Sequence, residues 1–218
     1  MFDKSKIIEV AERAARQAGR AVIDQWSAYR NDIHHKGMTD VVSAADFAAD
    51  RIVSAAINNG FPRHRILSEE GASADELDFE GPLWIIDPID GTANYVRGHG
   101  YFAISIAFAV DGVVQVGCVH APMLGETFLA TKGGGSKLNG RSIKASSPNS
   151  LIKSIVSTGF PHEKPEFDYL IKRVSFLLRN CQDVRRVAPL CWTSHMSEWV
   201  GWMLIQKRFF RGMLPHPA

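Results

Sequence analysis

The sequence predicts a layered fold of the α+β or mixed α/β class. Two segments with helical periodicity come first, and a run of short apolar segments bounded by turn residues follows them. The chain has 218 residues, 45% of them hydrophobic and 22% charged, so it can bury a sizeable core as one large domain or two small ones. Its net charge of +2 is too small to indicate nucleic acid or an anionic membrane as the main partner, and we expect neither.

The first helix is expected over residues 5–28, where apolar side chains recur every three or four residues and Lys, Arg and Glu fill much of the opposite face. The second helix is expected to begin after Ser43, because Ser43-Ala44-Ala45-Asp46 has the form of a capping box with Asp in place of the usual Glu or Gln. It should end at Asn59-Gly60, shortly before Pro62.

Short strands are predicted after these helices. Ile66-Leu67 and Leu83-Trp84-Ile85-Ile86 are apolar runs that each end in acidic residues. Residues 102–110 and 113–119 flank Asp111-Gly112, which is the pattern of a β-hairpin with a tight turn. The other elements expected are a strand at 127–131, a turn at Gly133-Gly134-Gly135 and a helix over 166–179.

The sequence predicts neither export nor a membrane span. The N-terminus lacks the uninterrupted apolar run and the cleavage site of a secretory signal, and no window approaches 18 apolar residues. Cys118, Cys181 and Cys191 are an odd number of cysteines without metal-ligand spacing, which is typical of thiols in a reducing compartment. We therefore expect a cytoplasmic protein.

The chemistry is concentrated in one stretch, residues 84–94. A buried strand brings Asp87 and Asp90 onto a turn at its C-terminal end, Pro88 stiffens the link between them, and Gly91 permits a close backbone approach. Carboxylates held in this way suit a hard cation such as Mg²⁺. If a helix begins near Gly91, its free N–H groups and positive dipole end can hold a phosphate beside the metals. A lone Asp-Gly pair would indicate only a turn, but the whole stretch favours a metal site.

Two further acids, Glu69 and Glu70, follow the strand predicted at Ile66-Leu67. By itself such a pair is typical of a solvated loop, but beside the Asp cluster it becomes a candidate ligand. Asp46, considered alone, is an ordinary helix-cap residue.

These residues resemble the inositol monophosphatase family of magnesium-dependent, lithium-sensitive phosphatases. Asp87-Pro88-Ile89-Asp90-Gly91-Thr92 matches the family motif, and the resemblance extends over residues 5–187. It implies an αβαβα sandwich of the inositol monophosphatase and fructose-bisphosphatase type whose C-terminal part is incomplete here. It also implies Mg²⁺ as cofactor and a possible homodimer. The other matching segments are 43–46, 68–70, 102–119, 122–131, 133–135 and Thr158-Gly159-Phe160-Pro161.

The resemblance also implies a role for each matching residue. The metal ligands would be Glu69, Asp87, the backbone carbonyl of Ile89, and Asp90. Catalysis would use Glu69 together with Thr92, which orients the attacking water, and Asp46, the hydrogen-bond partner of Thr92. The substrate phosphate would lie against Asp90 and the backbone N–H groups of Gly91, Thr92 and Ala93.

This allocation agrees with the chemistry of phosphoryl transfer. Two metals about 3.5–4 Å apart can activate a water and neutralise the leaving oxygen. The reaction needs mainly positioning and charge stabilisation, so carboxylates, metals and backbone amides suffice. The expected substrate is a small phosphate monoester, first of all inositol monophosphate. Histidinol phosphate, fructose 1,6-bisphosphate and 3′-phosphonucleotides are the alternatives.

The resemblance stops near Val187. The family carries a Trp-Asp motif near its C-terminus whose Asp completes the second metal site, whereas the last Asp of this chain is Asp183. Residues 188–218 instead contain three Trp and no helical period. We therefore divide the chain into an inositol monophosphatase-like domain, 1–187, and an aberrant tail, 188–218. One interpretation of the tail is a membrane-surface or partner segment.

A shifted reading frame near codon 187 explains the tail better than a membrane-surface or partner segment does. In the alternative frame, each codon joins the third base of one codon to the first two bases of the next. With permitted synonymous codons the tail then reads GAAVLDIAYVGVGRLDAYPETLFPWDAA, which resembles the family's own C-terminal region and contains its Trp-Asp motif. The genetic code forces Asp at Trp192/Thr193, Gly at Trp199/Val200 and Asp at Trp202/Met203.

Two other functions stay open besides that of a phosphatase: a non-catalytic binding or regulatory protein that kept the fold, and a non-functional gene product. We expect the 218-residue chain to be poorly soluble and nearly inactive. Losing one carboxylate weakens a two-metal site. Losing the final strands exposes core surface and an unpaired sheet edge.

Overall fold

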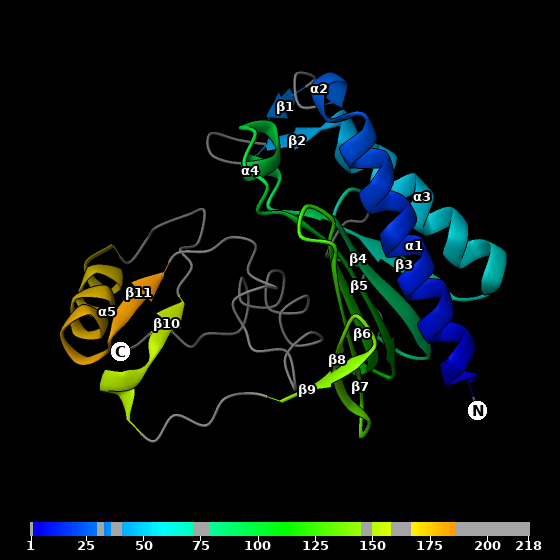
Figure 1. Cartoon of the computed structure of the whole chain (residues 1–218). Coiled ribbons are helices and arrows are strands. Elements are labelled where there is room, and N and C mark those ends of the chain that lie inside the picture. The colour runs from blue at the N-terminus through cyan, green and yellow to red at the C-terminus, as the bar shows by residue number, and fades with distance from the viewer. Residues whose placement is uncertain are drawn as a thin grey trace, which may run out of the picture.

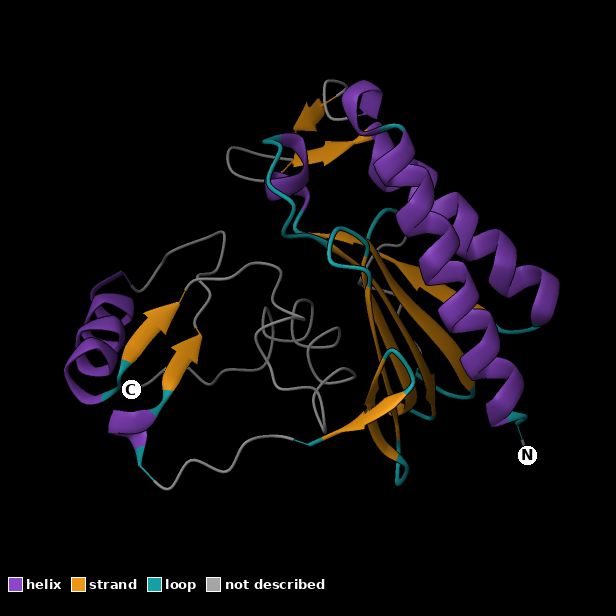
Figure 2. Ribbon diagram, in the orientation of Figure 1, coloured by secondary structure: helices purple, strands orange, loops and turns teal. Residues whose placement is uncertain are grey.

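The computed structural model describes residues 2–29, 33–35, 41–71, 79–144, 150–157 and 167–185 (Figure 1). Thr158–Pro161 and the proposed tail, 188–218, lie outside the described residues. Helices and strands are both abundant and form separate layers, which confirms the expected mixed α/β class (Figure 2).

Helix α1, Lys4–Asp24, begins at Asp3, whose Oδ1 accepts hydrogen bonds from the N–H groups of Ser5 and Lys6 at 3.0 and 3.1 Å. The expected helix over 5–28 is interrupted at Gln25, and a short helix α2, Trp26–Tyr29, follows. The break has a tertiary cause, because the indole N–H of Trp26 donates to the carbonyl of Tyr95 at 3.0 Å.

Helix α3, Ala44–Gly60, confirms the second predicted helix and its capping box. The backbone N–H and the hydroxyl of Ser43 both donate to Oδ2 of Asp46 at 2.8 Å. The helix ends at Gly60, where the Asn59-Gly60 signal and the nearby Pro62 predicted it.

A seven-stranded sheet forms the centre of the fold, in the order β3-β4-β5-β6-β7-β8-β9. Strands β3 and β4 pair in parallel and all later neighbours are antiparallel. The predicted hairpin is confirmed: Asp111 and Gly112 connect β5 to β6 with φ values of +50° and +72°. The strands are β3 Arg65–Ser68, β4 Pro82–Asp90, β5 Ala103–Val110, β6 Val113–Ala121, β7 Glu126–Thr131, β8 Gly135–Leu138 and β9 Arg141–Ile143.

Helices α1 and α3 cover one face of this sheet (Figure 1). Ile104, Ile106 and Phe108 of β5 face these helices, and the ring of Phe108 lies 5.1 Å from that of Trp84. A second, smaller apolar cluster on the opposite face contains Ile85 and Ala107. The sheet is therefore buried on both faces around β3, β4 and β5.

The remaining described elements are short or peripheral. A short helix α4, Thr92–Val96, follows β4, and a 3₁₀ helix spans Leu151–Lys153. Strands β1, Ile33–His35, and β2, Val41–Ser43, form an antiparallel pair, and β10, Ile155–Ser157, pairs in parallel with β11, Asp183–Arg185. Helix α5, Phe167–Asn180, confirms the helix predicted over 166–179. Within the described residues, no helix is long and apolar enough to cross a membrane.

Candidate active site

The C-terminal end of β4 is irregular where it carries the two predicted carboxylates. Asp87 pairs with Ser105 and Asp90 with Ala103, so three steps along β4 match two steps along β5. The extra residue is a β-bulge, a feature common beside active sites. Directly paired residues share a face, so the bulge turns Asp90 onto the same face as Asp87, whereas a regular strand would put them on opposite faces. The expectation that both carboxylates lie on a turn is wrong, because β4 extends through Asp90.

Both carboxylates are buried, with 4% of Asp87 and 5% of Asp90 exposed. Pro88 lies within the bulge, one of the few strand positions where a residue without an N–H group is tolerated. Ile86 and Ile89 point toward the helices on the other face. The alternation along β4 therefore separates an apolar helix side from an acidic side.

Glu69 lies beside Asp87. The N–H of Glu69 donates to the carbonyl of Ile86 at 3.2 Å, which continues the parallel β3–β4 register by one residue beyond Ser68. Unlike Asp87, Glu69 is exposed. The acid predicted from the neighbouring strand thus lies at the same end of the sheet as the Asp pair.

Thr92 joins Asp46 to the end of β4. Its Oγ1 lies 2.9 Å from Oδ1 of Asp46 and 2.9 Å from the carbonyl oxygen of Ile89. Asp46 is 1% exposed, and this burial raises its pKa to about 6, against the opposing effect of hydrogen bonds from Ser43 and Thr92. The predicted pairing of Asp46 with Thr92 is confirmed as a contact, although the two residues are far apart in the sequence.

Gly91 forms the junction between β4 and α4. Its φ of +101° lies in the left-handed region, and a Cβ at this position would lie 3.1 Å from the carbonyl oxygen of Tyr101. Only glycine fits such a position without strain. The N–H groups of Thr92 and Ala93 belong to the first turn of α4, where no intrahelical acceptor is available.

The structure brings together some of the predicted residues more closely than others. Asp46, Thr92 and Ile89 are linked by hydrogen bonds. Glu69 is placed next to Asp87 by the continued pairing of β3 with β4. Across the described part of the chain, no three His, Cys, Asp or Glu side chains are close enough to hold a metal ion by themselves. A metal here would need the backbone carbonyl of Ile89 or waters besides the carboxylates.

Two serines support this site, and only Ser105 was missed from the sequence. Ser43 completes the hydrogen bonding of Asp46, as the predicted capping box implies. Ser105 pairs with Asp87, but it lies within an apolar strand and carries no local signal.

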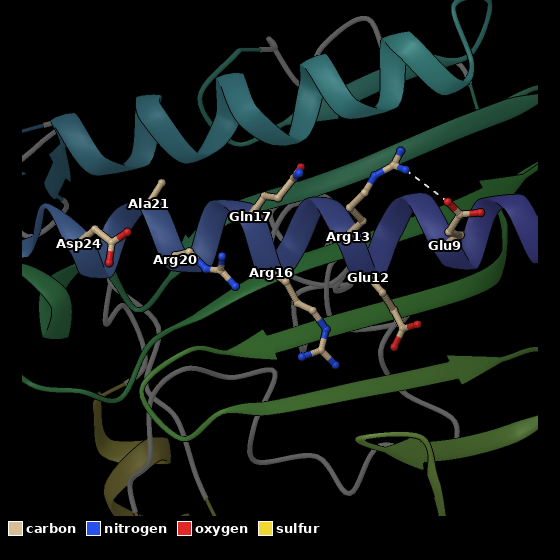
Figure 3. A pocket seen from close by; sticks show the side chains of 8 residues that line it. All are labelled: Glu9, Glu12, Arg13, Arg16, Gln17, Arg20, Ala21 and Asp24. Carbon is tan, nitrogen blue, oxygen red and sulfur yellow. Dashed lines mark hydrogen bonds and ion pairs between the residues drawn. The ribbon is translucent and has the colours of Figure 1, made fainter.

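A shallow depression runs along the exposed side of α1 (Figure 3). Its charges balance, and Arg13 Nη1 lies 3.2 Å from Glu9 Oε1. None of the predicted site residues lines it. The lining residues are Glu9, Glu12, Arg13, Arg16, Gln17, Arg20, Ala21 and Asp24.

Known proteins resemble this chain over most of its length. The model of the inositol monophosphatase family matches residues 3–194. Nus factor SuhB of Vibrio cholerae is 36% identical over 182 residues, which cover 83% of this chain and 68% of the relative. The inositol monophosphatase of Dictyostelium discoideum is 33% identical over 178 residues, which cover 81% of this chain and 64% of the relative.

Solved structures show the same fold. The extragenic suppressor protein suhB of Bartonella henselae superposes with a TM-score of 0.78 at 29% identity, covering 86% of this chain and 72% of that protein. An IMPase of Thermotoga maritima superposes with a TM-score of 0.76 at 28% identity, covering 90% of this chain and 80% of that protein.

Proposed function

Because the chain belongs to the inositol monophosphatase family, we propose that it hydrolyses a small phosphate monoester in a Mg²⁺-dependent reaction, with inositol monophosphate as the first substrate to test. The observation that carries the proposal is the hydrogen-bonded group of Asp46, Thr92 and Ile89, at the end of the strand that bears Asp87 and Asp90. Such a group supplies what phosphoryl transfer needs, which is positioned polar atoms beside buried carboxylates.

Mg²⁺ is the proposed cofactor, and the donor set fits it. Glu69, Asp87, Asp90 and the carbonyl of Ile89 offer only oxygen atoms, the ligand type that Mg²⁺ prefers. Burying the carboxylates of Asp87 and Asp90 is costly unless a cation or hydrogen-bond donors compensate. When bound, Mg²⁺ would lower the pKa of a coordinated water and stabilise charge on the leaving oxygen.

Thr92 is proposed to orient the attacking water. A hydroxyl group has one proton and two lone pairs, and the Thr92 proton is directed to Asp46 Oδ1 or to the carbonyl of Ile89. The lone pairs are then left to accept a hydrogen bond from water. Asp46 fixes this orientation, while Glu69 lies at the exposed side of the site and takes part in activating the same water.

The phosphate group is proposed to lie against the junction of β4 and α4. The N–H groups of Gly91, Thr92 and Ala93 are available there as donors, and Asp90 adjoins them. The missing Cβ of Gly91 lets the backbone turn tightly beneath the carbonyl of Tyr101. Backbone donors aimed at a phosphate cost no reorganisation during the reaction.

We further propose that residues 1–187 form the phosphatase domain and that residues 188–218 are read out of frame. The support is the set of forced codons at Trp192, Trp199 and Trp202, which yield Asp, Gly and Asp in the alternative frame. The frame-restored chain is defined as residues 1–187 followed by the alternative tail. It is expected to be the working enzyme, and the 218-residue chain to be nearly inactive.

The test is phosphate release by both chains from inositol monophosphate, histidinol phosphate, fructose 1,6-bisphosphate and a 3′-phosphonucleotide. Each substrate is assayed with Mg²⁺, with EDTA, and with Mg²⁺ plus Li⁺. The frame-restored chain should turn over one substrate strongly, only with Mg²⁺, and lose activity in Li⁺. Strong turnover by the 218-residue chain would overturn the assignment of the tail, and no turnover by the frame-restored chain would overturn the proposed activity.

A second candidate function is the one named in the SuhB relatives, that of a Nus factor. The observation that favours it is their 34–36% identity to this chain over 182 residues. Intact Mg²⁺ binding without turnover of any substrate would favour this candidate. The expectations of a possible homodimer and of no nucleic-acid or membrane partner stay predictions.

A further inference from the structure

Ser105 of β5 is a buried polar residue at the candidate site to which no role has been given so far. Its side chain is 0% exposed, and its Oγ makes no hydrogen bond to any group in the part of the chain that the structure describes. Buried hydroxyl groups are nearly always hydrogen-bonded, because removing them from water without a new partner is costly. The Ser105 hydroxyl can therefore donate a hydrogen bond that no described group accepts in this structure.

Ser105 faces the acidic side of the sheet. Its neighbours Ile104 and Ile106 belong to the helix-side core, and Ala107 belongs to the cluster on the opposite face. Because side chains alternate along a strand, Ser105 points away from α1 and α3. The same alternation along β4 places Ile85 and Asp87 on this face.

Ser105 is the direct cross-strand partner of Asp87. Residues paired in this way have Cβ atoms about 4.5–5.5 Å apart, within reach of one hydrogen bond or one bridging water. Glu69 lies on the other side of Asp87, so that Glu69, Asp87 and Ser105 form a row across the sheet. The row thus joins two acids, which only accept hydrogen bonds when ionised, to a hydroxyl that can donate one.

We propose that Ser105 is a positioning residue of the metal site: when Mg²⁺ is bound, its hydroxyl donates to the Asp87 carboxylate, directly or through one water, and so fixes the orientation of that ligand. The inference rests on the proposed Mg²⁺ site. Hydrogen bonds from outside the ligand set orient metal-binding carboxylates, and their loss commonly weakens affinity 10- to 100-fold. Mg²⁺ demands nearly ideal octahedral geometry, whereas Ca²⁺ tolerates irregular coordination.

The test compares metal binding by the 218-residue chain and by the frame-restored chain, each with and without Ser105→Ala. Calorimetric titrations with MgCl₂ and with CaCl₂ give the dissociation constants, and thermal melts in EDTA give the stability without metal. Ser136→Ala is the matched control, because Ser136 is also buried, at 6% exposure, but lies on β8, three strands away from β5.

We expect Ser105→Ala to raise the Kd for Mg²⁺ about tenfold and the Kd for Ca²⁺ by a smaller factor. The melting temperature in EDTA should not fall, because the substitution removes no hydrogen bond to any group in the described part of the chain. Ser136→Ala should bind Mg²⁺ like the wild type. If Ser105→Ala does not fold, Ser105→Cys keeps a similar size and a weak donor, and should show a smaller loss of Mg²⁺ affinity.

The outcomes separate this inference from the proposed function. A wild-type chain that binds Mg²⁺ and a Ser105→Ala variant that binds it equally well would overturn the role of Ser105 alone. Equal losses of Mg²⁺ and Ca²⁺ affinity together with a lower melting temperature in EDTA would also overturn it, because they indicate a structural role. Absence of Mg²⁺ binding by the frame-restored chain without the substitution would overturn both the role of Ser105 and the proposed metal site.

Discussion

Replacing Thr92 with Val removes the hydroxyl that links α3 to the end of β4 and nearly preserves the shape of the side chain. Thr92 Oγ1 lies 2.9 Å from both Asp46 Oδ1 and the carbonyl oxygen of Ile89. Asp46 is 1% exposed and Ile89 2% exposed, so neither acceptor can readily form a hydrogen bond with water in place of Thr92. Leaving one buried acceptor without its donor costs about 1–3 kcal/mol. Because one hydroxyl supplies one proton, we expect the free energy of unfolding to fall by that amount.

Urea denaturation followed by circular dichroism in EDTA measures this change for the wild type, Thr92→Val and Thr92→Ser. The Thr92→Ser variant keeps the hydroxyl and loses only a methyl group, so it should be more stable than Thr92→Val. In a protein of this size, the melting temperature of Thr92→Val should fall by about 2–4 °C for each kcal/mol lost. If Thr92→Val is as stable as Thr92→Ser, the hydroxyl does not hold the two segments together and the reasoning fails.

Two further predictions concern packing and pH. Gly19→Ala should lower the free energy of unfolding by about 1–3 kcal/mol in a thermal or urea melt. The reason is that the new Cβ would lie 2.6 Å from Cδ2 of His120 and 3.1 Å from Cβ of Pro122. An unchanged melting temperature would contradict this prediction. Burial raises the pKa of Asp46 from 3.8 to about 6, so the folded state favours the protonated carboxyl group. The stability that protonated Asp46 contributes is therefore full below about pH 4 and declines as pH rises through 6. Asp46→Asn removes this titration. Relative to the wild type in EDTA, the variant should therefore gain up to about 3 kcal/mol of unfolding free energy between these pH values, and a constant difference would refute the shift.

The local elements were predictable because their signals are local. The capping box at Ser43 and Asp46 specifies the start of α3, and Asp111-Gly112 specifies the two-residue turn between β5 and β6. The position of Glu69 was also predictable from the sequence, because Glu69 directly follows the predicted strand β3 and therefore lies at its C-terminal end.

Features that depend on distant partners were not predictable. Gln25 interrupts the first helix where Trp26 reaches the carbonyl of Tyr95, a contact that no local pattern reveals. The bulge between Asp87 and Asp90 exists only relative to β5, so the sequence suggested a turn there instead. Pairing between distant segments likewise defines β10 and β11, which are only three residues long each and lie far apart in the sequence.

The measurement closest to the central proposal is Mg²⁺-dependent phosphate release from inositol monophosphate by the frame-restored chain and its Asp87→Asn variant. Asp87 is 4% exposed at the end of β4, and losing one carboxylate of a metal site should lower the rate by about 100-fold or more. Asp168→Asn is the control, since Asp168 is exposed on α5. The account predicts rapid release by the unmodified chain and the control, and almost none by Asp87→Asn. Equal rates in all three chains, or release that persists in EDTA, would contradict it.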